Sequence, residues 1–530
     1  KTPLIGIANT YGETISGHIV FKELVDHVRR GIYRAGGSTA EFGTIACCDG
    51  MTNSNAGAHF SLPSREIIAD SVECMVRAHK FDGLVIMASC DKIVPGCLMA
   101  AARLNIPTIV IQGGPMTSGI LFHGKKSHIG CGSVAKGEFT RGLISQQELD
   151  DYTTTFCPTC GSCQFYGTAN TMSSMAESLG MALPGSALIP AVYNERRRVA
   201  FQTGEAIVEL VKKGITAKQI MTADALENAA RVLLASGGST NAVLHLTAIY
   251  HTLGFDSKAF LQNFNHVSDD TPRIVNVVPS TGAYDCEDFY LAGGIPRVMQ
   301  NLGDKIHLNA LTCTGKTVGE NLEEYHYLYP ENTEVIRPID NPFETGGSLV
   351  ILHGNLAPGS AVAKPGSIPM HMRKFTGKAK VYESEDRAKK GIFGGEIEPG
   401  TVVIIRNEGP KGGPGMREMA VCLKALEGMG LGDSCALITD GRFAGMNGGC
   451  FVCHITPESA LGGPLAVVHD GDMIDIDFDE KRTINVRVSD EELAERLKHW
   501  TYVPQQEIDS SFLRRYVASV KSVEFGGTLD

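Results

Sequence analysis

A thiol, a carboxylate and an amine stand next to one another at Cys90, Asp91 and Lys92. A thiolate is a soft metal ligand and a carboxylate is a hard one, so this pair suits two different metals held side by side. The apolar run at residues 84–88 precedes them and predicts a strand buried on both faces. Open parallel sheets bind ligands at the loops that follow such strands, so we expect the functional site around Cys90.

Three further cysteines form the run Cys157-Pro-Thr-Cys160-Gly-Ser-Cys163. This spacing lets neighbouring thiolates face one centre, as in zinc and iron–sulfur sites. The alternatives are a redox pair or buried thiols in a glycine-rich turn. A structural zinc site needs four protein ligands, and no second CxxC motif lies nearby. A cluster completed by Cys90 is therefore the more economical interpretation.

A second carboxylate could come from Asp49, in the sequence Cys48-Asp49-Gly50, although an Asp-Gly pair is also typical of a plain turn. A third could come from Glu418, which ends a Gly/Pro-rich loop at residues 407–418. We expect a helix over residues 417–427, so Glu418 is either a metal ligand or a favourable partner of the helix dipole.

The backbone amides of the loop at residues 407–418 could bind an anion. The alternative is a tight connection with no ligand. The loop lacks the Gly-Lys-Ser/Thr sequence of a Walker motif, which disfavours nucleoside triphosphate binding.

The pattern of predicted secondary structure that must position these residues changes near residue 340. Before it, helical patterns such as residues 21–35 alternate with short apolar strands such as residues 108–111. Beyond it, short β-like runs dominate, at residues 348–353, 402–406, 435–439, 465–468, 473–478 and 483–488, with helical patterns only at 417–427 and 491–499. We predict an α/β domain with a parallel sheet over residues 1–340, and a β-rich, barrel-like domain over residues 341–530.

The composition limits the class of function. The 530 residues carry a net charge of −11 without a basic run, which argues against nucleic acid as the partner. No apolar run is long enough to span a bilayer, so we expect a cytoplasmic protein without a membrane partner. The 15 cysteines are spread through apolar and glycine-rich segments, unlike those of a small disulfide-bonded scaffold.

Seven segments carry motifs that belong together: CDGMTNSNAGAHFSLPSREIIADS at 48–71, CDKIVPG at 90–96, CPTCGSCQFYGTANTM at 157–172, ASGGSTNAVLH at 235–245, HGNLAPGSAVAK at 353–364, EGPKGGPGMRE at 408–418 and ITDGRFAG at 438–445. With these motifs the chain resembles the dihydroxy-acid dehydratase/6-phosphogluconate dehydratase family, which includes sugar-acid dehydratases. The resemblance covers nearly the whole chain. It implies an N-terminal α/β domain with an iron–sulfur cluster, a C-terminal barrel-like domain closing over it, and a homodimer or a dimer of dimers.

The resemblance also assigns roles to particular residues. It implies that Cys90 and Cys163 are cluster ligands. It implies that Asp49, Asp91 and Glu418 bind Mg²⁺. It also implies that Lys92, in the catalytic centre, is carbamylated and supplies a further oxygen ligand.

The third cluster ligand stays open at this point. Members of the family with a [2Fe–2S] cluster carry a cysteine three residues before a histidine near the N-terminus, and this chain has Ile15 before His18. The candidates are Cys160, Cys157 and Cys48. The run at residues 157–163 favours a [4Fe–4S] cluster, with [2Fe–2S] as the alternative.

The family's general base is a serine, and this chain has Ala444 at that position. A methyl group cannot accept a proton. Either the sequence is an engineered knock-out, or another group acts as the base, or the activity is low.

The function implied by the resemblance is that of a hydro-lyase, which converts a small 2,3-dihydroxy carboxylic acid to a 2-keto-3-deoxy acid. FYGTAN at 165–170 and CDKIVPG at 90–96 favour a sugar acid as the substrate. One alternative is 2,3-dihydroxy-isovalerate, the substrate in branched-chain amino-acid biosynthesis. The other, motivated by Ala444, is a catalytically silent metal-binding homologue.

Overall fold

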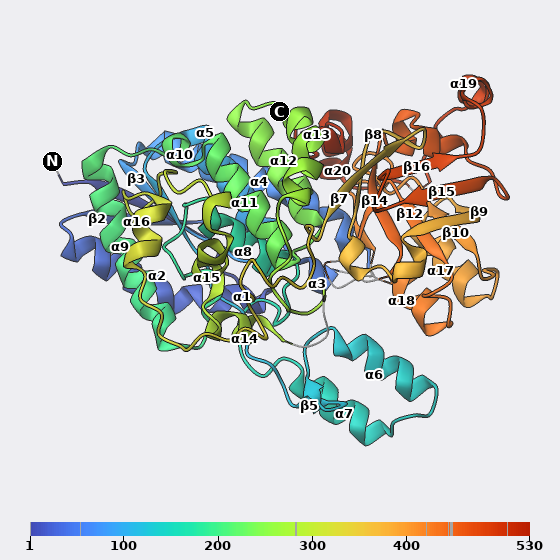
Figure 1. The fold of residues 1–530 in the computed structure, drawn as a ribbon. Helices are drawn as coiled ribbons and strands as arrows, with labels where there is room; N and C mark the ends of the chain where they lie inside the picture. Colours follow the sequence, from blue (N-terminus) through green and yellow to red (C-terminus); the bar gives the residue numbers. More distant parts are fainter. Residues whose placement is uncertain are drawn as a thin grey trace. The chain divides into compact units, whose positions relative to one another are not determined.

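The computed structural model describes residues 2–52, 55–280, 284–419, 421–443, 445, 449–505 and 507–529. The chain divides into two compact units (Figure 1). Unit 1 comprises Lys1–Cys48, Ile67–Ser239 and Thr271–Gly346, and unit 2 comprises Asp49–Glu66, Thr240–Asp270 and Gly347–Asp530. Two segments that precede residue 340 therefore belong to the unit that holds the C-terminal part of the chain.

Unit 1 is built around a parallel sheet of four strands in the order β2-β1-β3-β4. The strands are β1 (Leu4–Asn9), β2 (Ser38–Gly43), β3 (Gly83–Met87) and β4 (Thr108–Ile111). Every residue of β3 and β4 is buried, as expected for parallel strands covered by helices on both faces. The predicted α/β class and the strand before Cys90 are confirmed.

Helices α2 (Phe21–Arg34) and α9 (Asn194–Lys213) pack closely against each other. They approach so closely because glycines stand at the crossing. A Cβ atom added at Gly31 would lie 2.0 Å from the carbonyl oxygen of Phe201, and one added at Gly204 would lie 2.1 Å from that of Val28. Helix α5 (Ile93–Leu104) follows Lys92 directly.

The remaining elements of unit 1 are α1 (Ser16–Ile19), β5 (Leu121–Phe122), β6 (Lys125–Lys126), α6 (Cys131–Thr140), α7 (Gln146–Thr155), α8 (Thr168–Ser178), α10 (Ala217–Ile220), α11 (Ala223–Ser236), α14 (Cys286–Leu291), α15 (Gly294–Leu302), the 3₁₀ turn Gly303–Lys305 and α16 (Val318–Glu324). Helix α4 (Ser61–His79) begins in a segment of unit 2 and continues into unit 1.

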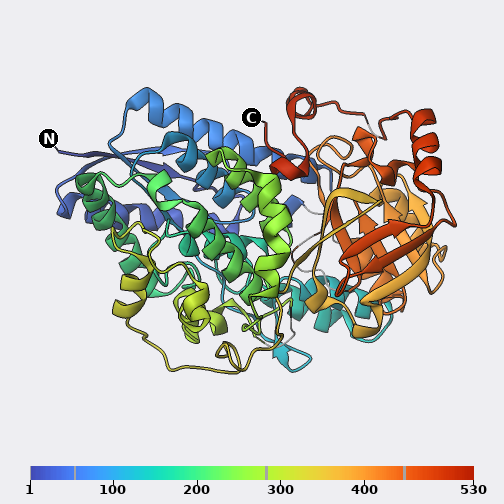
Figure 2. The same cartoon turned by 45° about the horizontal axis from the view of Figure 1, so that its top comes forward.

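Unit 2 contains a closed barrel of eight strands in the order β10-β12-β14-β8-β7-β16-β15-β9, drawn in orange and red in Figures 1 and 2. The strands are β7 (Val350–Gly354), β8 (Ala357–Ala363), β9 (Lys374–Tyr382), β10 (Thr401–Ile405), β12 (Ala436–Thr439), β14 (Phe451–Thr456), β15 (Met473–Asp477) and β16 (Thr483–Val486). The barrel-like prediction is confirmed. The barrel core includes Leu352, Ile404 and Val452, all fully buried.

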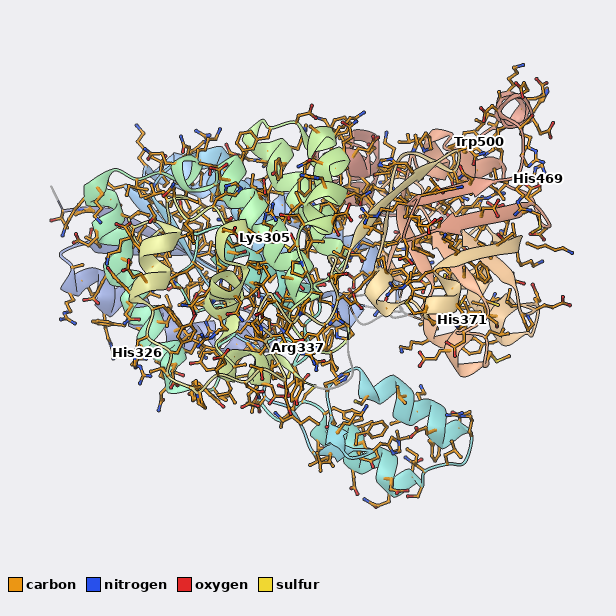
Figure 3. The ribbon with its side chains drawn as sticks, viewed as in Figure 1. Lys305, His326, Arg337, His371, His469 and Trp500 are labelled. Atoms are coloured by element: carbon orange, nitrogen blue, oxygen red, sulfur yellow. The ribbon has the colours of Figure 1, made fainter. Side chains whose placement is uncertain are left out.

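The other elements of unit 2 are α3 (Asp49–Thr52), α12 (Asn241–Leu253), α13 (Ser257–Asp269), α17 (Glu385–Phe393), β11 (Glu418–Met419), α18 (Val421–Gly428), β13 (Arg442–Phe443), α19 (Asp490–His499), α20 (Ser511–Ser519) and the 3₁₀ turns Ala56–Phe60, Pro365–Ser367, Met370–Met372, Ser459–Leu461, Pro464–Val467 and Val523–Phe525. The only tryptophan of the chain, Trp500, packs partly buried against the barrel core; Figure 3 labels it.

Three sequence-based predictions in unit 2 are wrong. Helices were expected only at residues 417–427 and 491–499, but α17 and α20 are helices as well. The strand expected at residues 465–468 is a 3₁₀ turn, Pro464–Val467, because the proline at its start sets a helical φ angle and cannot donate to a strand. The helix expected over residues 417–427 begins only at Val421, and Glu418 lies in β11 instead. Among the described helices, none combines the length and the apolar character that crossing a bilayer requires.

Candidate active site

Cys90 lies three residues beyond the end of β3, in unit 1. Its backbone has a φ angle of +71°, in the left-handed region that a residue with a side chain rarely adopts. Such strained residues gather at functional sites, where the surrounding structure holds them in place. The strained turn directs the chain from β3 into α5, and the Cys90 side chain is buried.

The thiols of Cys48 and Cys163 lie close to that of Cys90. A hydrogen bond with the Cys48 thiol, burial, and the nearby Asp91 and Cys163 raise the pKa of Cys90 well above its ordinary value. Burial, and then Cys48 and Asp91, raise the pKa of Cys163 in the same way. Three thiols that are far apart in the sequence therefore gather at one place in unit 1, which we call the thiol site.

Backbone hydrogen bonds hold Cys163 at the thiol site. The preceding residue, Ser162, donates its N–H to the carbonyl of Gly114 at 2.9 Å and accepts from the N–H of Met116 at 2.8 Å. The backbone comes so close here that a Cβ atom added at Gly161 would lie 2.4 Å from the Met116 nitrogen. The loop that carries the three-cysteine run is thereby joined to the segment after β4.

The other two cysteines of the run lie differently. Cys157 is exposed, although it still raises the pKa of the Cys163 thiol, and Cys160 is half-buried. Cys160 lines a surface pocket together with Lys22 and Arg197. Of the three candidates for a third cluster ligand, Cys48 is the one whose thiol hydrogen-bonds with that of Cys90.

The segment around Ile15 packs against the thiol site without supplying a sulfur. Ile15 is buried just before α1, and a Cβ atom added at Gly17 would lie 3.4 Å from the Cys90 sulfur. His18 is fully buried, and its Nε2 lies 3.0 Å from the carbonyl oxygen of Ser89. Burial lowers the pKa of His18 below its ordinary value.

Lys92 is fully buried at the start of α5, and its Nζ lies 3.5 Å from Oδ2 of Asp91. A buried lysine is compatible with the predicted carbamylation, which stays a prediction. Asp91 belongs to unit 1, whereas Asp49 and Glu418 belong to unit 2. That these three acids bind one Mg²⁺ also stays a prediction.

Asp49 and Glu418 both form ion pairs with the guanidinium of Arg442, in unit 2. Nη1 of Arg442 lies 2.5 Å from Oε1 of Glu418, and Nη2 lies 3.3 Å from Oδ1 of Asp49. Strands β11 and β13 place Glu418 directly opposite Arg442 in a parallel pair. All three side chains are buried, so we call them the carboxylate site.

Four backbone amides of the loop at residues 407–418 donate to the chain's own carboxylates. The N–H groups of Lys411 and Gly412 donate to the carboxylate of Glu458, at 3.1 and 3.0 Å. The N–H groups of Asn407 and Glu408 donate to Asp440, at 3.2 and 3.0 Å. Because the chain's own buried carboxylates take these donors, the anion-binding prediction is wrong for these four amides.

Ala444 lies outside the described residues, so its predicted place in the catalytic centre stays a prediction. Sequence reasoning missed the roles of Arg442 and Asn241. Both residues lie in motifs that carried the family resemblance, at 438–445 and 235–245. No spacing rule could have paired them with Glu418, since the contacts form only in the folded chain.

Comparisons with known proteins show which family the chain belongs to. A family model described as dihydroxy-acid/6-phosphogluconate dehydratase N-terminal matches residues 2–321, and the corresponding C-terminal model matches residues 334–527. A protein of Caldanaerobacter subterraneus subsp. tengcongensis named dihydroxy-acid dehydratase is 46% identical, over 98% of this chain and 93% of that protein.

Proteins of the same name from two other organisms also match over almost their full lengths. The one from Halothermothrix orenii is 46% identical over 100% of this chain and 95% of its own length. The one from Methanosarcina barkeri is 44% identical over the same shares. These names favour the dihydroxy-acid alternative over the sugar-acid interpretation. Since both family models and relatives of this similarity cover almost the full length, the chain belongs to the dihydroxy-acid/6-phosphogluconate dehydratase family and is a hydro-lyase.

Proposed function

We propose that this enzyme removes water from a short, branched 2,3-dihydroxy acid, with 2,3-dihydroxy-isovalerate as the substrate and 2-keto-isovalerate as the product. The observation that carries the proposal is the near full-length identity of 44–46% with relatives named dihydroxy-acid dehydratase. The sugar-acid preference depended on two short motifs, which the full-length similarity outweighs.

The thiol site fits an iron–sulfur cluster. Its donors are three soft sulfur ligands, and the surroundings of Cys90 and Cys163 raise the pKa of these two thiols unless a cation binds them. We propose Cys48, Cys90 and Cys163 as the ligands. Three protein thiols also leave room for an exogenous ligand on the cluster, whereas a structural zinc site would be filled by four protein ligands.

The carboxylate site fits Mg²⁺, which prefers carboxylate oxygens. We propose that Asp49 and Glu418 bind it, together with Asp91 and a carbamylated Lys92. When bound, both groups would supply Lewis acidity. The cluster would assist the departure of the C3 hydroxyl, and Mg²⁺ would stabilise the negative charge that develops at the C2 oxygen.

The chain's own residues prepare this site. Arg442 is fully buried, and its guanidinium pairs with the carboxylates of Asp49 and Glu418 and orients them before the substrate arrives. A base must remove the proton at C2 while the hydroxide leaves C3, and the enol that results tautomerises to the keto acid. The methyl group of Ala444 cannot serve as that base.

The proposal is tested by anaerobic purification, iron and sulfide analysis with an absorbance spectrum, and a keto-acid assay. We expect iron with inorganic sulfide, and keto acid formed from 2,3-dihydroxy-isovalerate. A panel of aldonic acids runs beside it. Turnover of an aldonic acid alone would restore the sugar-acid interpretation, and a colourless protein with stoichiometric zinc would contradict the cluster.

The substitution Ala444→Ser tests the base. We expect turnover to rise by about 10²-fold or more, because general base catalysis typically contributes that much. The measurement compares kcat of both proteins at equal iron content. Equal or lower turnover in the serine variant would mean that another group removes the proton.

The cytoplasmic location was expected from the lack of a bilayer-spanning apolar run, and the assembly into a homodimer or dimer of dimers is implied by the family resemblance; both stay predictions. Light scattering coupled to size-exclusion chromatography measures the assembly state.

A further inference from the structure

The motif ASGGSTNAVLH at residues 235–245 has no part in the chemistry described so far. Its Asn241 is the first residue of α12 and is fully buried. The Asn241 side chain reaches the carboxylate site of unit 2. Its Nδ2 donates to Oε1 of Glu418 at 2.5 Å and lies 3.3 Å from the carbonyl oxygen of Phe443.

Oε1 of Glu418 therefore accepts from two donors, Nδ2 of Asn241 and Nη1 of Arg442, each at 2.5 Å. The last torsion of a glutamate side chain has no sharp rotamer preference, so its carboxylate plane turns easily unless hydrogen bonds hold it. Two donors on one oxygen, from α12 and from β13, fix that plane. They also fix the direction of the second oxygen.

The two donors differ in charge. Removing Arg442 would take away a positive charge, which favours the binding of a cation. It would also take away a hydrogen bond that orients Glu418, which weakens the binding. Asn241 is neutral. Its removal changes the orientation of Glu418 while the charge of the site stays the same, so Asn241 isolates the effect of orientation.

We propose that Asn241 is a positioning residue for the divalent-cation site: it holds the Glu418 carboxylate in the orientation that binds Mg²⁺. The inference depends on the proposed function, in which Glu418 is a Mg²⁺ ligand. Partners of metal ligands typically contribute 10- to 100-fold to metal affinity. We expect a loss of that size when the Asn241 donor is removed.

The test measures Mn²⁺ binding to the full-length, cluster-containing enzyme by electron paramagnetic resonance of the free ion. Mn²⁺ takes the same hard oxygen ligands as Mg²⁺ and allows direct counting. The variants are Asn241→Ala and Asn241→Leu. The leucine variant keeps nearly the same side-chain size without the donor, so it stays informative where the smaller alanine prevents folding.

Asn265→Ala is the matched control. Asn265 is an asparagine of the same unit, on the next helix, α13, and it also bonds a neighbouring backbone: its Nδ2 donates to the carbonyl of Ile351 at 2.7 Å. We expect the Mn²⁺ dissociation constant to rise about tenfold or more in the Asn241 variants and to stay within about threefold in the control. A smaller rise in the Asn241 variants, or an equal rise in the control, would overturn the inference.

Glu418→Gln separates this inference from the proposed function. If Glu418→Gln binds Mn²⁺ as tightly as the original chain, then Glu418 is not a ligand and the proposed metal site fails. If Glu418→Gln loses Mn²⁺ while both Asn241 variants keep it, the metal site stands and only the positioning role fails.

Discussion

Three residue types do the chemistry proposed for this enzyme, and each works only in a particular surrounding. A thiol is a poor ligand while it keeps its proton, and the surroundings of Cys90 and Cys163 raise the pKa of both thiols. A buried carboxylate is costly unless it is paired, and Arg442 pairs with Asp49 and Glu418 at once. Unit 1 thus holds the soft ligands and unit 2 holds the paired carboxylates, each in its own surrounding.

At this scale, the substitution Cys48→Ser tests the third cluster ligand. A serine hydroxyl is a hard donor and a poor ligand for iron, so we expect the iron and sulfide content to fall below half. Cys160→Ser is the matched control, since Cys160 faces a surface pocket. Colorimetric iron analysis measures both. If Cys160→Ser loses iron while Cys48→Ser retains it, the ligand assignment is wrong.

Among the elements, the connections matter more than the strands and helices themselves. The turn after β3 carries Cys90, and β11 and β13 pair Glu418 with Arg442. The loop at residues 407–418 is shaped by two buried carboxylates, Asp440 and Glu458, which accept its backbone N–H groups. Buried backbone donors need such partners, and here they come from side chains. The loop is therefore held in a shape that presents Glu418.

At the scale of this loop, Glu458→Gln should change how stability depends on pH. Burial, and then the nearby Asp440, raise the pKa of Glu458 to about 7. As the pH rises from about 4.5 to 7, the unfolded chain loses this proton while the folded chain keeps it, so the folded state loses stability. Glutamine does not titrate. The stability of the variant relative to the original chain should therefore rise over this range, by at most about 3 kcal/mol.

Urea unfolding at pH 5, 6, 7 and 8, followed by the fluorescence of Trp500, measures this difference within unit 2. A constant offset between the two proteins is expected as well, because the amide replaces one acceptor oxygen with a donor. Two pH profiles that run parallel from pH 5 to 8 would contradict the raised pKa.

For the whole molecule, the division into units does not follow the order of the sequence. The predicted change from helices to strands near residue 340 matches the point where the chain enters the barrel. Residues 49–66 and 240–270, however, also belong to unit 2. Both segments are helical or turn-like, and nothing in their own periodicity assigns them to a β-rich unit. They are also the segments that bring Asp49 and Asn241 to Glu418.

At this scale, removal of iron should destabilise unit 1 much more than unit 2. Its proposed ligands lie at positions 48, 90 and 163, and a cofactor that binds only the folded state stabilises that state. We expect the midpoint of thermal unfolding, measured by far-ultraviolet circular dichroism, to fall by at least several degrees. Trp500 reports on the barrel and is the only tryptophan, so its transition should move less. Equal shifts by both probes would contradict this expectation.

The sequence by itself determined the family, the parallel sheet, the strand before Cys90 and the barrel, because these follow from periodicity and from motifs that are local in the chain. Only the tertiary structure decided which thiol meets Cys90, which cation pairs with Glu418, and which anion takes the loop amides. Those partners come from distant parts of the chain. Burial and hydrogen-bond satisfaction select them, and neither leaves a local pattern in the order of the residues.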